Sequence, residues 1–272
     1  MNLKKIIILL LVIQALIGTF FEVTQFFLPS WIRHMYLPDI FEFARTLTWL
    51  FGILSYVLTF VGVIQIIQNK NVELFSAFKF PIFLLFAENI FWFITTSLST
   101  EYSFFIPGAN APWHFYLYKT LSLALLILIS IHYLNKNKEE DNAETILAGK
   151  GARFFNWIID LSIILSFSFG HMKTLSQGYI FEDIAFLNSS ASWFIFINMF
   201  WYYLILELFF HQTIGKLHNN SYVHFEGSKF KAILLRTLCR FIPFEAFSFF
   251  GKEGWHDSIS KTKVTVPTRD KD

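Results

Sequence analysis

The chain has 272 residues, of which 54% are hydrophobic, 20% aromatic and only 15% charged, and its mean hydropathy is +0.49. A soluble globular domain carries about 25% charged residues. These values therefore exclude that class and indicate a polytopic membrane protein. The single cysteine, Cys239, excludes an internal disulfide and a site built from several thiolates.

Six apolar stretches are long enough to cross a bilayer as helices. The first begins after Lys5, runs to about Leu28 and lacks a small-x-small cleavage site, which favours a retained span over a secretory signal. The other five, in chain order, are Leu47 to Ile67, Phe80 to Leu98, Phe115 to Leu134, Phe154 to about Met172, and Trp193 to about Phe210. We therefore expect an all-α membrane protein with about six transmembrane helices.

The lysines and arginines predict how these helices are oriented. Basic residues are enriched in cytoplasmic loops. If the N-terminus is cytoplasmic, the inner side receives Lys4, Lys5, Lys70, Lys79, Lys136, Lys138, Lys150, Arg153, Lys216 and a basic C-terminal segment. The outer side then holds Arg33, Arg45, Lys119 and Lys173. The asymmetry predicts a multi-pass protein of a bacterial plasma (inner) membrane with both termini in the cytoplasm.

A hydrophilic stretch divides the chain into two halves. Residues 1–134 are expected to form a four-helix transmembrane region, and residues 135–150 a charged cytoplasmic linker. Residues 151–266 would then form a second domain with two transmembrane helices, and residues 267–272 a disordered end. No internal repeat relates the halves, so the inverted-repeat signature of many secondary transporters is missing.

The segment Lys229 to Phe250 follows the last span and is apolar, but it contains Arg236 and Arg240. Each central arginine costs roughly 2.5–3.5 kcal/mol on insertion scales. The two arginines are four residues apart and share one helical face, which leaves the leucines for another. We expect an amphipathic helix on the cytoplasmic side of the membrane. A second possibility is that it inserts between the spans and brings its arginines to Asp160. The tail that follows, up to Val266, is β-like.

Asp160 is the most informative polar residue, because it lies inside the apolar run Phe154 to Phe169. Arg153 stands seven residues upstream, which places both on one helical face. Their axial separation of about 10 Å is long for direct pairing, so we expect a third group, a water molecule or an ion between them. Asp160 has two possible roles: a carrier of a proton or cation, or a structural salt bridge with Arg153 or Arg236.

The C-terminal half carries an ordered set of motifs. Arg153 and Asp160 are followed by Gln212-Thr-Ile-Gly-Lys216, then by Leu234-Leu-Arg-Thr-Leu-Cys-Arg240-Phe-Ile-Pro-Phe, and last by His256-Asp257 with Thr262 and Val264 behind it. In this combination residues 148–266 resemble the RDD family of membrane proteins, named for an arginine and two aspartates. The resemblance implies that these are Arg153, Asp160 and Asp257. Because some members are linked to sodium/proton antiport, it also suggests ion transport. Residues 1–134 resemble no family we recognise.

Further acidic residues lie inside predicted spans. Glu22 and Glu88 indicate a polar cavity in the N-terminal half, to which Gln14, Gln25, Gln65 and Asn198 would contribute; alternatively, each acid is protonated and bonds a neighbouring helix. Glu207 and His211 are one turn apart. They would either relay protons or form a local ion pair at the membrane edge.

His256 and Asp257 have no second histidine cluster near them in the sequence, so we do not expect a metal site. Asp257 is expected either to cap the tail or to pair with Arg236, Arg240 or Lys216 and so dock the tail under the membrane. Lys216 is expected to face lipid headgroups. The chain has no phosphate loop, nucleophile elbow, Cys-x-x-Cys pair or His-Glu-x-x-His motif. We therefore expect neither an enzyme nor a cofactor.

Two hypotheses remain. One is a transporter of a small cation or proton-coupled solute, with Asp160 as carrier and a charge network of Arg153, Asp257, Arg236, Arg240, Glu88, Glu22 and Glu207. The other is a non-transporting accessory or assembly subunit. The expected partners are the lipid bilayer, a small cation or proton, and a membrane protein or a second copy, with no nucleic acid.

Overall fold

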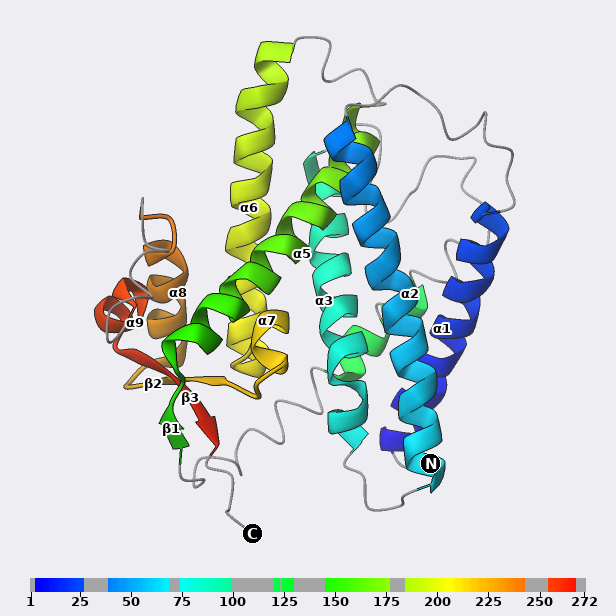
Figure 1. Cartoon of the computed structure of the whole chain (residues 1–272), viewed down its shortest axis with the longest axis horizontal. Helices are drawn as coiled ribbons and strands as arrows, with labels where there is room; N and C mark the ends of the chain where they lie inside the picture. Colours follow the sequence, from blue (N-terminus) through cyan, green and yellow to red (C-terminus); the bar gives the residue numbers. More distant parts are fainter. Residues whose placement is uncertain are drawn as a thin grey trace. The chain divides into compact units, whose positions relative to one another are not determined.

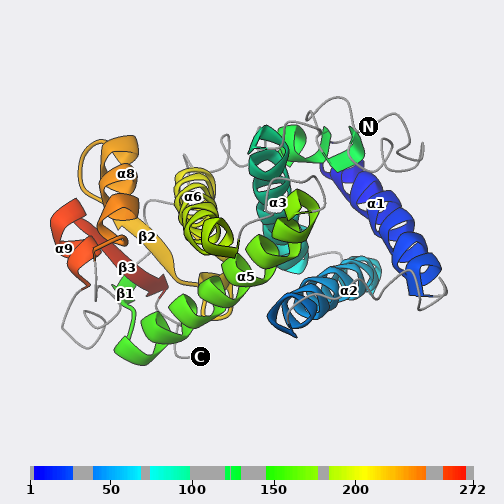
Figure 2. The same cartoon turned by 90° about the horizontal axis from the view of Figure 1, so that it is seen from above.

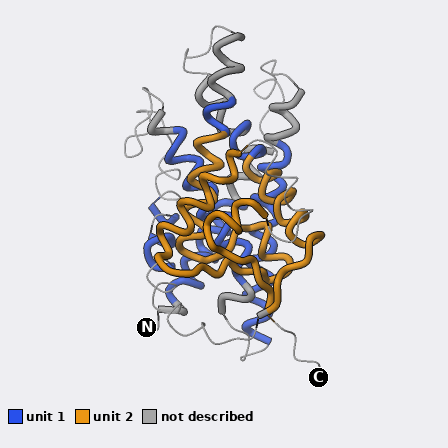
Figure 3. Tube along the Cα trace, turned by 90° about the vertical axis from the view of Figure 1, so that its left-hand side faces the viewer, with its two compact units in different colours: residues 1–130, 165–195 blue, residues 131–164, 196–272 orange. Residues whose placement is uncertain are grey.

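The computed structural model describes residues 3–26, 39–68, 74–98, 120–122, 124–129, 145–176, 184–242 and 254–267. The chain divides into two compact units, coloured separately in Figure 3. Unit 1 comprises residues 1–130 and 165–195, and unit 2 comprises residues 131–164 and 196–272. Both α5 (Lys150–Ser176) and α6 (Ile184–Phe210) contribute to both units. The packing units therefore differ from the predicted domains 1–134 and 151–266.

Unit 1 is helical in its described part. It contains α1 (Leu3–Phe26), α2 (Asp39–Gln68) and α3 (Leu74–Leu98), and α2 packs against both other helices (Figure 1). A further short apolar helix spans Thr120–Ile129. Its Ser122 hydroxyl accepts a 2.8 Å hydrogen bond from the Gln14 amide of α1. The rings of Phe91 and Phe167 stack with centroids 5.3 Å apart, so aromatic packing joins α3 to the C-terminal half of α5.

Four described helical segments are long and apolar enough to cross a membrane. They are Thr46–Gln68, Phe78–Thr95, Lys150–Phe169 and Ser192–Phe210. The segments Ile6–Thr19 and Thr120–Ile129, which belong to the first and fourth predicted spans, are apolar but shorter. The prediction of a helical membrane protein thus agrees with the structure, and four of its six spans reach spanning length among the described residues.

Unit 2 adds a small sheet that the all-α prediction missed. Its strands are β1 (Thr145–Leu147), β2 (Tyr222–Phe225) and β3 (Thr262–Pro267). The order is β1-β3-β2 with both pairs antiparallel, and Val223 lies opposite Val264. Strand β1 lies within the stretch predicted as a charged linker, residues 135–150. The tail from Gly254 to Val266 was predicted to be β-like; this is confirmed from Thr262 onward, in β3, and wrong for Trp255–Ser260, which is helical.

The described part of unit 2 also contains three short helices: α7 (Ile214–Leu217), α8 (Lys229–Cys239) and α9 (Trp255–Ser260). Figure 2 shows α8 and α9 beside the sheet, and both contact β3. With 11 residues, α8 is about 16 Å long, roughly half of the thickness of a bilayer core. It is therefore too short to cross a membrane, as expected. Residues 243–250 of the same predicted segment lie outside the described residues.

The two faces of α8 are those that the sequence predicted, but the charged face is the buried one. Arg236 is 1% exposed, whereas Leu238 is 49% exposed and Phe230 55%. The apolar face is thus the one that points away from the protein. The buried side of the helix combines the small apolar residues Ala232 and Ile233 with the arginine.

This orientation of α8 predicts how its residues contribute to stability. Replacing Ile233, which is fully buried, by alanine should lower the free energy of unfolding in detergent by about 2–5 kcal/mol, because it leaves a cavity. Leu238→Ala on the outer face is the control and should cost well under half as much. A larger loss for Leu238→Ala than for Ile233→Ala, in thermal or denaturant unfolding, would mean that the faces are reversed.

Candidate functional site

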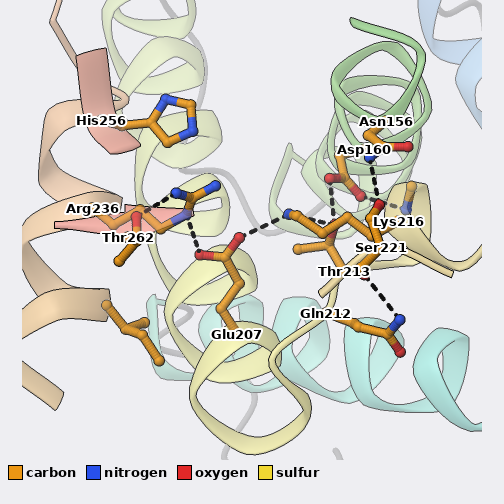
Figure 4. A network of polar contacts seen from close by, with 12 residues as sticks. Asn156, Asp160, Glu207, Gln212, Thr213, Lys216, Ser221, Arg236, His256 and Thr262 are labelled. Carbon is orange, nitrogen blue, oxygen red and sulfur yellow. Dashed lines mark hydrogen bonds and ion pairs between the residues drawn. The ribbon is translucent and has the colours of Figure 1, made fainter. Parts of the chain in front are cut away.

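Glu207 of α6 is the centre of the largest charge cluster among the described residues of unit 2. Its carboxylate is completely buried and pairs with three basic side chains, of which Figure 4 labels Lys216 and Arg236. Lys216 Nζ lies 2.8 Å from Oε1, Arg240 Nη2 lies 2.6 Å from the same oxygen, and Arg236 Nε lies 3.2 Å from Oε2. A buried carboxylate requires such partners, since an unpaired charge in a low dielectric is strongly destabilising.

The chain reverses after α6, and this brings Lys216 back to Glu207. The backbone N–H of His211 still bonds the Glu207 carbonyl oxygen. His211 itself then adopts a left-handed conformation with φ of 56°, which costs a non-glycine residue about 1–2 kcal/mol. Its carbonyl oxygen accepts from Val223 of β2, so the turn is held by the sheet. The short helix α7 follows and directs Lys216 inward.

A second arm of the cluster ties α8, α9 and β3 together. Arg236 Nη1 donates to Asp257 Oδ1 of α9 and to Thr262 Oγ1 of β3, the latter at 2.7 Å. Figure 4 shows Arg236 between Thr262 and Glu207, with His256 on the same side. Arg236 therefore bridges two buried carboxylates. The predicted pairing of Asp257 with a basic residue of this segment is confirmed for Arg236.

Asp160 has a different set of partners. Tyr202 donates its hydroxyl to Oδ1 at 2.6 Å, and Thr213 donates to Oδ2 at 2.6 Å. The backbone N–H of Gly215 donates to Oδ1 at 2.7 Å. A β-carbon at Gly215 would lie 2.1 Å from the carbonyl oxygen of Asn156, so only glycine permits this approach to α5.

A chain of polar contacts joins the two carboxylates. Lys216 Nζ, which pairs with Glu207, also lies 3.3 Å from Thr213 Oγ1, and the Thr213 hydroxyl bonds Asp160. Beside it, the Asn156 amide bonds the Ser221 hydroxyl at 3.0 Å, and Gln212 donates to the Ser221 carbonyl oxygen at 2.9 Å. The segment between α6 and β2 is thus fixed against α5 by side-chain hydrogen bonds.

One cavity unites most of the residues predicted from the sequence. Arg153, Asp160 and Asp257 all line it. The other charged or titratable lining residues are Tyr203, Lys216, Arg236, Arg240 and His256. Arg153 is buried at the start of α5, where the backbone N–H of Ala148 bonds Val264 of β3 and fixes this end of the helix to the sheet.

Three predictions about charge pairing need correction. The arginines of α8 do not serve as the counter-charges of Asp160; they pair with Glu207 and Asp257 instead. Lys216 does not face lipid headgroups, because it is 4% exposed and paired with Glu207. Glu207 was predicted to form a local ion pair with His211, but its ion pairs are with Lys216, Arg236 and Arg240. The His211 ring packs edge-on against the Phe225 ring, with the two centroids 5.3 Å apart.

The acids of the N-terminal half belong to unit 1. Glu88 lines a cavity with Gln14, as predicted, whereas Gln65 is exposed and Asn198 belongs to unit 2. The side chains of Glu22 and Gln25 lie outside the described residues. Sequence reasoning missed Tyr202 and Thr213 as partners of Asp160. A tyrosine inside an apolar span and a threonine directly before Ile-Gly-Lys were the available signals.

Two groups outside the spans have shifted pKa values. Burial lowers the pKa of Lys216 from its usual 10.5, and the charge of Glu207 opposes that shift. Burial also holds the pKa of His256 well below its usual 6.5, and the positive charges of Arg236 and Arg240 add to the effect. His256 is therefore neutral in the folded protein near neutral pH.

Comparison of the chain with protein-family models, with curated proteins and with solved structures gave no match. Among the described residues, no group of three or more histidine, cysteine, aspartate or glutamate side chains is placed to hold a metal ion. The site is therefore interpreted from its own geometry.

Glu207→Gln tests the charge cluster. The change leaves Lys216, Arg236 and Arg240 without their shared anion, and it should lower the free energy of unfolding by about 3–5 kcal/mol. Glu226→Gln is the control, because Glu226 is exposed and pairs with Lys263 at 3.5 Å; it should cost less than about 1 kcal/mol. Equal losses for the two variants in detergent unfolding would contradict a structural role for Glu207.

His256 predicts a dependence of stability on pH. Because its folded-state pKa lies below 6.5, the unfolded chain binds a proton there first. Stability should therefore be flat above pH 6.5 for this group and fall as the pH drops below it, with a slope approaching about 1.4 kcal/mol per pH unit. His256→Gln should remove that part of the slope, and an unchanged pH profile would show that His256 is not held neutral.

Proposed function

We propose that this chain is an integral membrane protein of the RDD type that moves a small cation or a proton-coupled solute, with Asp160 as the carboxylate that takes up the ion. The observation that carries the proposal is the shared cavity of Arg153, Asp160 and Asp257. These are the three residues that the resemblance to the RDD family singles out. Asp257 is distant from the other two in sequence, and the fold brings it to their cavity.

The surroundings of Asp160 suit an exchanging group. Its side-chain partners are the hydroxyls of Tyr202 and Thr213, and a hydroxyl both donates and accepts hydrogen bonds. When a proton or cation occupies the carboxylate, the same oxygens can turn their lone pairs toward it. Ion uptake at Asp160 therefore requires no arginine salt bridge to break.

Glu207, unlike Asp160, is held by cationic side chains, and this suits the role of a fixed counter-charge. Its three cationic partners come from two separate elements, α7 and α8. Lys216 bonds Glu207 directly and contacts Thr213, whose hydroxyl bonds Asp160. A change in the charge of Asp160 therefore acts on a residue that also stabilises the Glu207 cluster. We propose that this contact couples occupancy of Asp160 to the position of the segment around α7.

A second candidate function is a non-transporting accessory or assembly subunit, and the completeness of the Glu207 cluster favours it. Ion pairs that join α6, α7 and α8 also serve to fix one packing of the unit. In this case the ligand of the protein is another membrane protein or a second copy. For either function we propose a bacterial inner membrane with both termini in the cytoplasm, on the distribution of basic residues.

Asp160→Asn separates the two functions. In everted vesicles that contain the wild-type protein, adding a sodium or potassium salt should change the internal pH, and the variant should reduce this change to the level of vesicles without the protein. The amide cannot exchange a proton at this site. Glu226→Gln, at an exposed acid, should retain the wild-type rate.

Wild-type flux in Asp160→Asn would reject the carrier role. If the wild-type protein produces no flux, and the variant only reduces the amount of protein or of a copurifying membrane partner, the subunit function is supported instead.

A further inference from the structure

A second polar cavity lies within unit 1, among α1, α2 and α3. Its polar lining comprises Gln14 of α1, Ser55, Tyr56 and Thr59 of α2, and Glu88 of α3. Aliphatic side chains form much of the rest. The cavity volume is about 40 Å³, a few times the roughly 10–15 Å³ that one water molecule needs. Only a small solute fits.

Gln14, Thr59 and Glu88 supply hydrogen-bond acceptors to this cavity. The Gln14 amide nitrogen donates to Ser122 at 2.8 Å, which leaves its carbonyl oxygen as the end available to the cavity. The Thr59 hydroxyl donates to the Ser55 carbonyl oxygen at 2.8 Å, so its lone pairs remain. Both side chains are at most 5% exposed. They are therefore built into the protein and do not belong to its surface.

The charge of the lining points to a cation. Glu88 supplies a carboxylate inside the segment Phe78–Thr95, which is long and apolar enough to cross a membrane. None of the described residues that line the cavity is basic. Acidic side chains at such depth mark ion or substrate pathways in membrane proteins. A carboxylate among acceptor oxygens matches a ligand that brings both a positive charge and hydrogen-bond donors.

Two further features of the cavity restrict the chemical class of the ligand. Tyr56 lies directly against α1, since a β-carbon at Gly18 would lie 2.2 Å from its hydroxyl oxygen. This fixes an aromatic ring, which attracts cations, at the wall of the cavity. Leu11, Leu84 and Leu85 supply an apolar wall, which suits an alkyl group and not the water shell of a metal ion.

We infer that this cavity is a binding site for a small primary ammonium ion, held by Glu88 with the oxygens of Gln14 and Thr59 as acceptors. The site belongs to unit 1 and does not use Asp160. It goes beyond the proposed ion-carrying role, because it assigns a solute-binding function to the four-helix half of the chain.

The test is equilibrium binding of radiolabelled methylammonium to the purified full-length protein in detergent. The wild type should bind it saturably at one site per chain. Glu88→Gln should abolish saturable binding, and Gln14→Leu and Thr59→Val should each weaken it about tenfold, as the loss of one hydrogen bond to a charged group implies. Gln65→Leu is the matched control for Gln14→Leu, because Gln65 lies on the exposed side of α2, and it should bind as the wild type does.

Competition between labelled methylammonium and other cations shows which features of the ligand the cavity recognises. Ammonium and ethylammonium should displace the label, whereas tetramethylammonium, which has no N–H donor, and sodium should displace it at least tenfold less well. Equal displacement by tetramethylammonium would overturn the acceptor-based site, and equal displacement by sodium would replace it with a metal-ion site.

Asp160→Asn should leave methylammonium binding unchanged, so this result is separable from failure of the proposed transport. Glu88→Asp keeps the charge and should retain weakened binding even if Glu88→Gln does not fold. Wild-type binding by Glu88→Asp, or a loss in the control Gln65→Leu equal to that in Gln14→Leu, would overturn the assignment.

Discussion

The buried carboxylate of Glu207 is the constraint on which unit 2 depends. A negative charge taken out of water is tolerated only where positive groups and donors replace the lost hydration. Here the replacements come from Lys216 of α7 and from Arg236 and Arg240 of α8. Both elements must therefore return to the end of α6. The left-handed turn at His211 and the close approach at Gly215 are local conditions of that return.

The same constraint explains why α8 is turned with its charges inward. Once Arg236 reaches Glu207 and Asp257, the leucines of the helix must face outward. In water this would be an unfavourable arrangement, but an apolar outer face suits a helix that lies at a membrane interface. Aromatic packing supports it, since Phe241 after α8 contacts Phe196 and Phe200 of α6, with ring centroids 5.6 and 6.4 Å apart. Arg240 also lies over the Tyr203 ring, 3.7 Å from its centroid.

The sequence predicted the helical membrane class, the burial of Asp160 and the two faces of α8, because these follow from hydropathy and helical periodicity. It did not predict which acid the arginines meet. Periodicity shows that Arg236 and Arg240 share a face, but the choice between Asp160 and Glu207 depends on how α8 returns to α6. Strand β1 was missed because Thr145–Leu147 follows a charged stretch and is too short to show alternation. Its pairing with β3 comes from the far end of the chain.

The central claim is that Glu207, and not Asp160, is the counter-charge of the arginines on α8. A double-mutant cycle measures this directly, with Glu207→Gln and Arg240→Gln combined in one series and Asp160→Asn and Arg240→Gln in the other, using free energies of unfolding in detergent. Direct contact predicts a coupling energy of about 1–3 kcal/mol for the first pair and one within about 0.5 kcal/mol of zero for the second. A larger coupling between Asp160 and Arg240 than between Glu207 and Arg240 would contradict the claim.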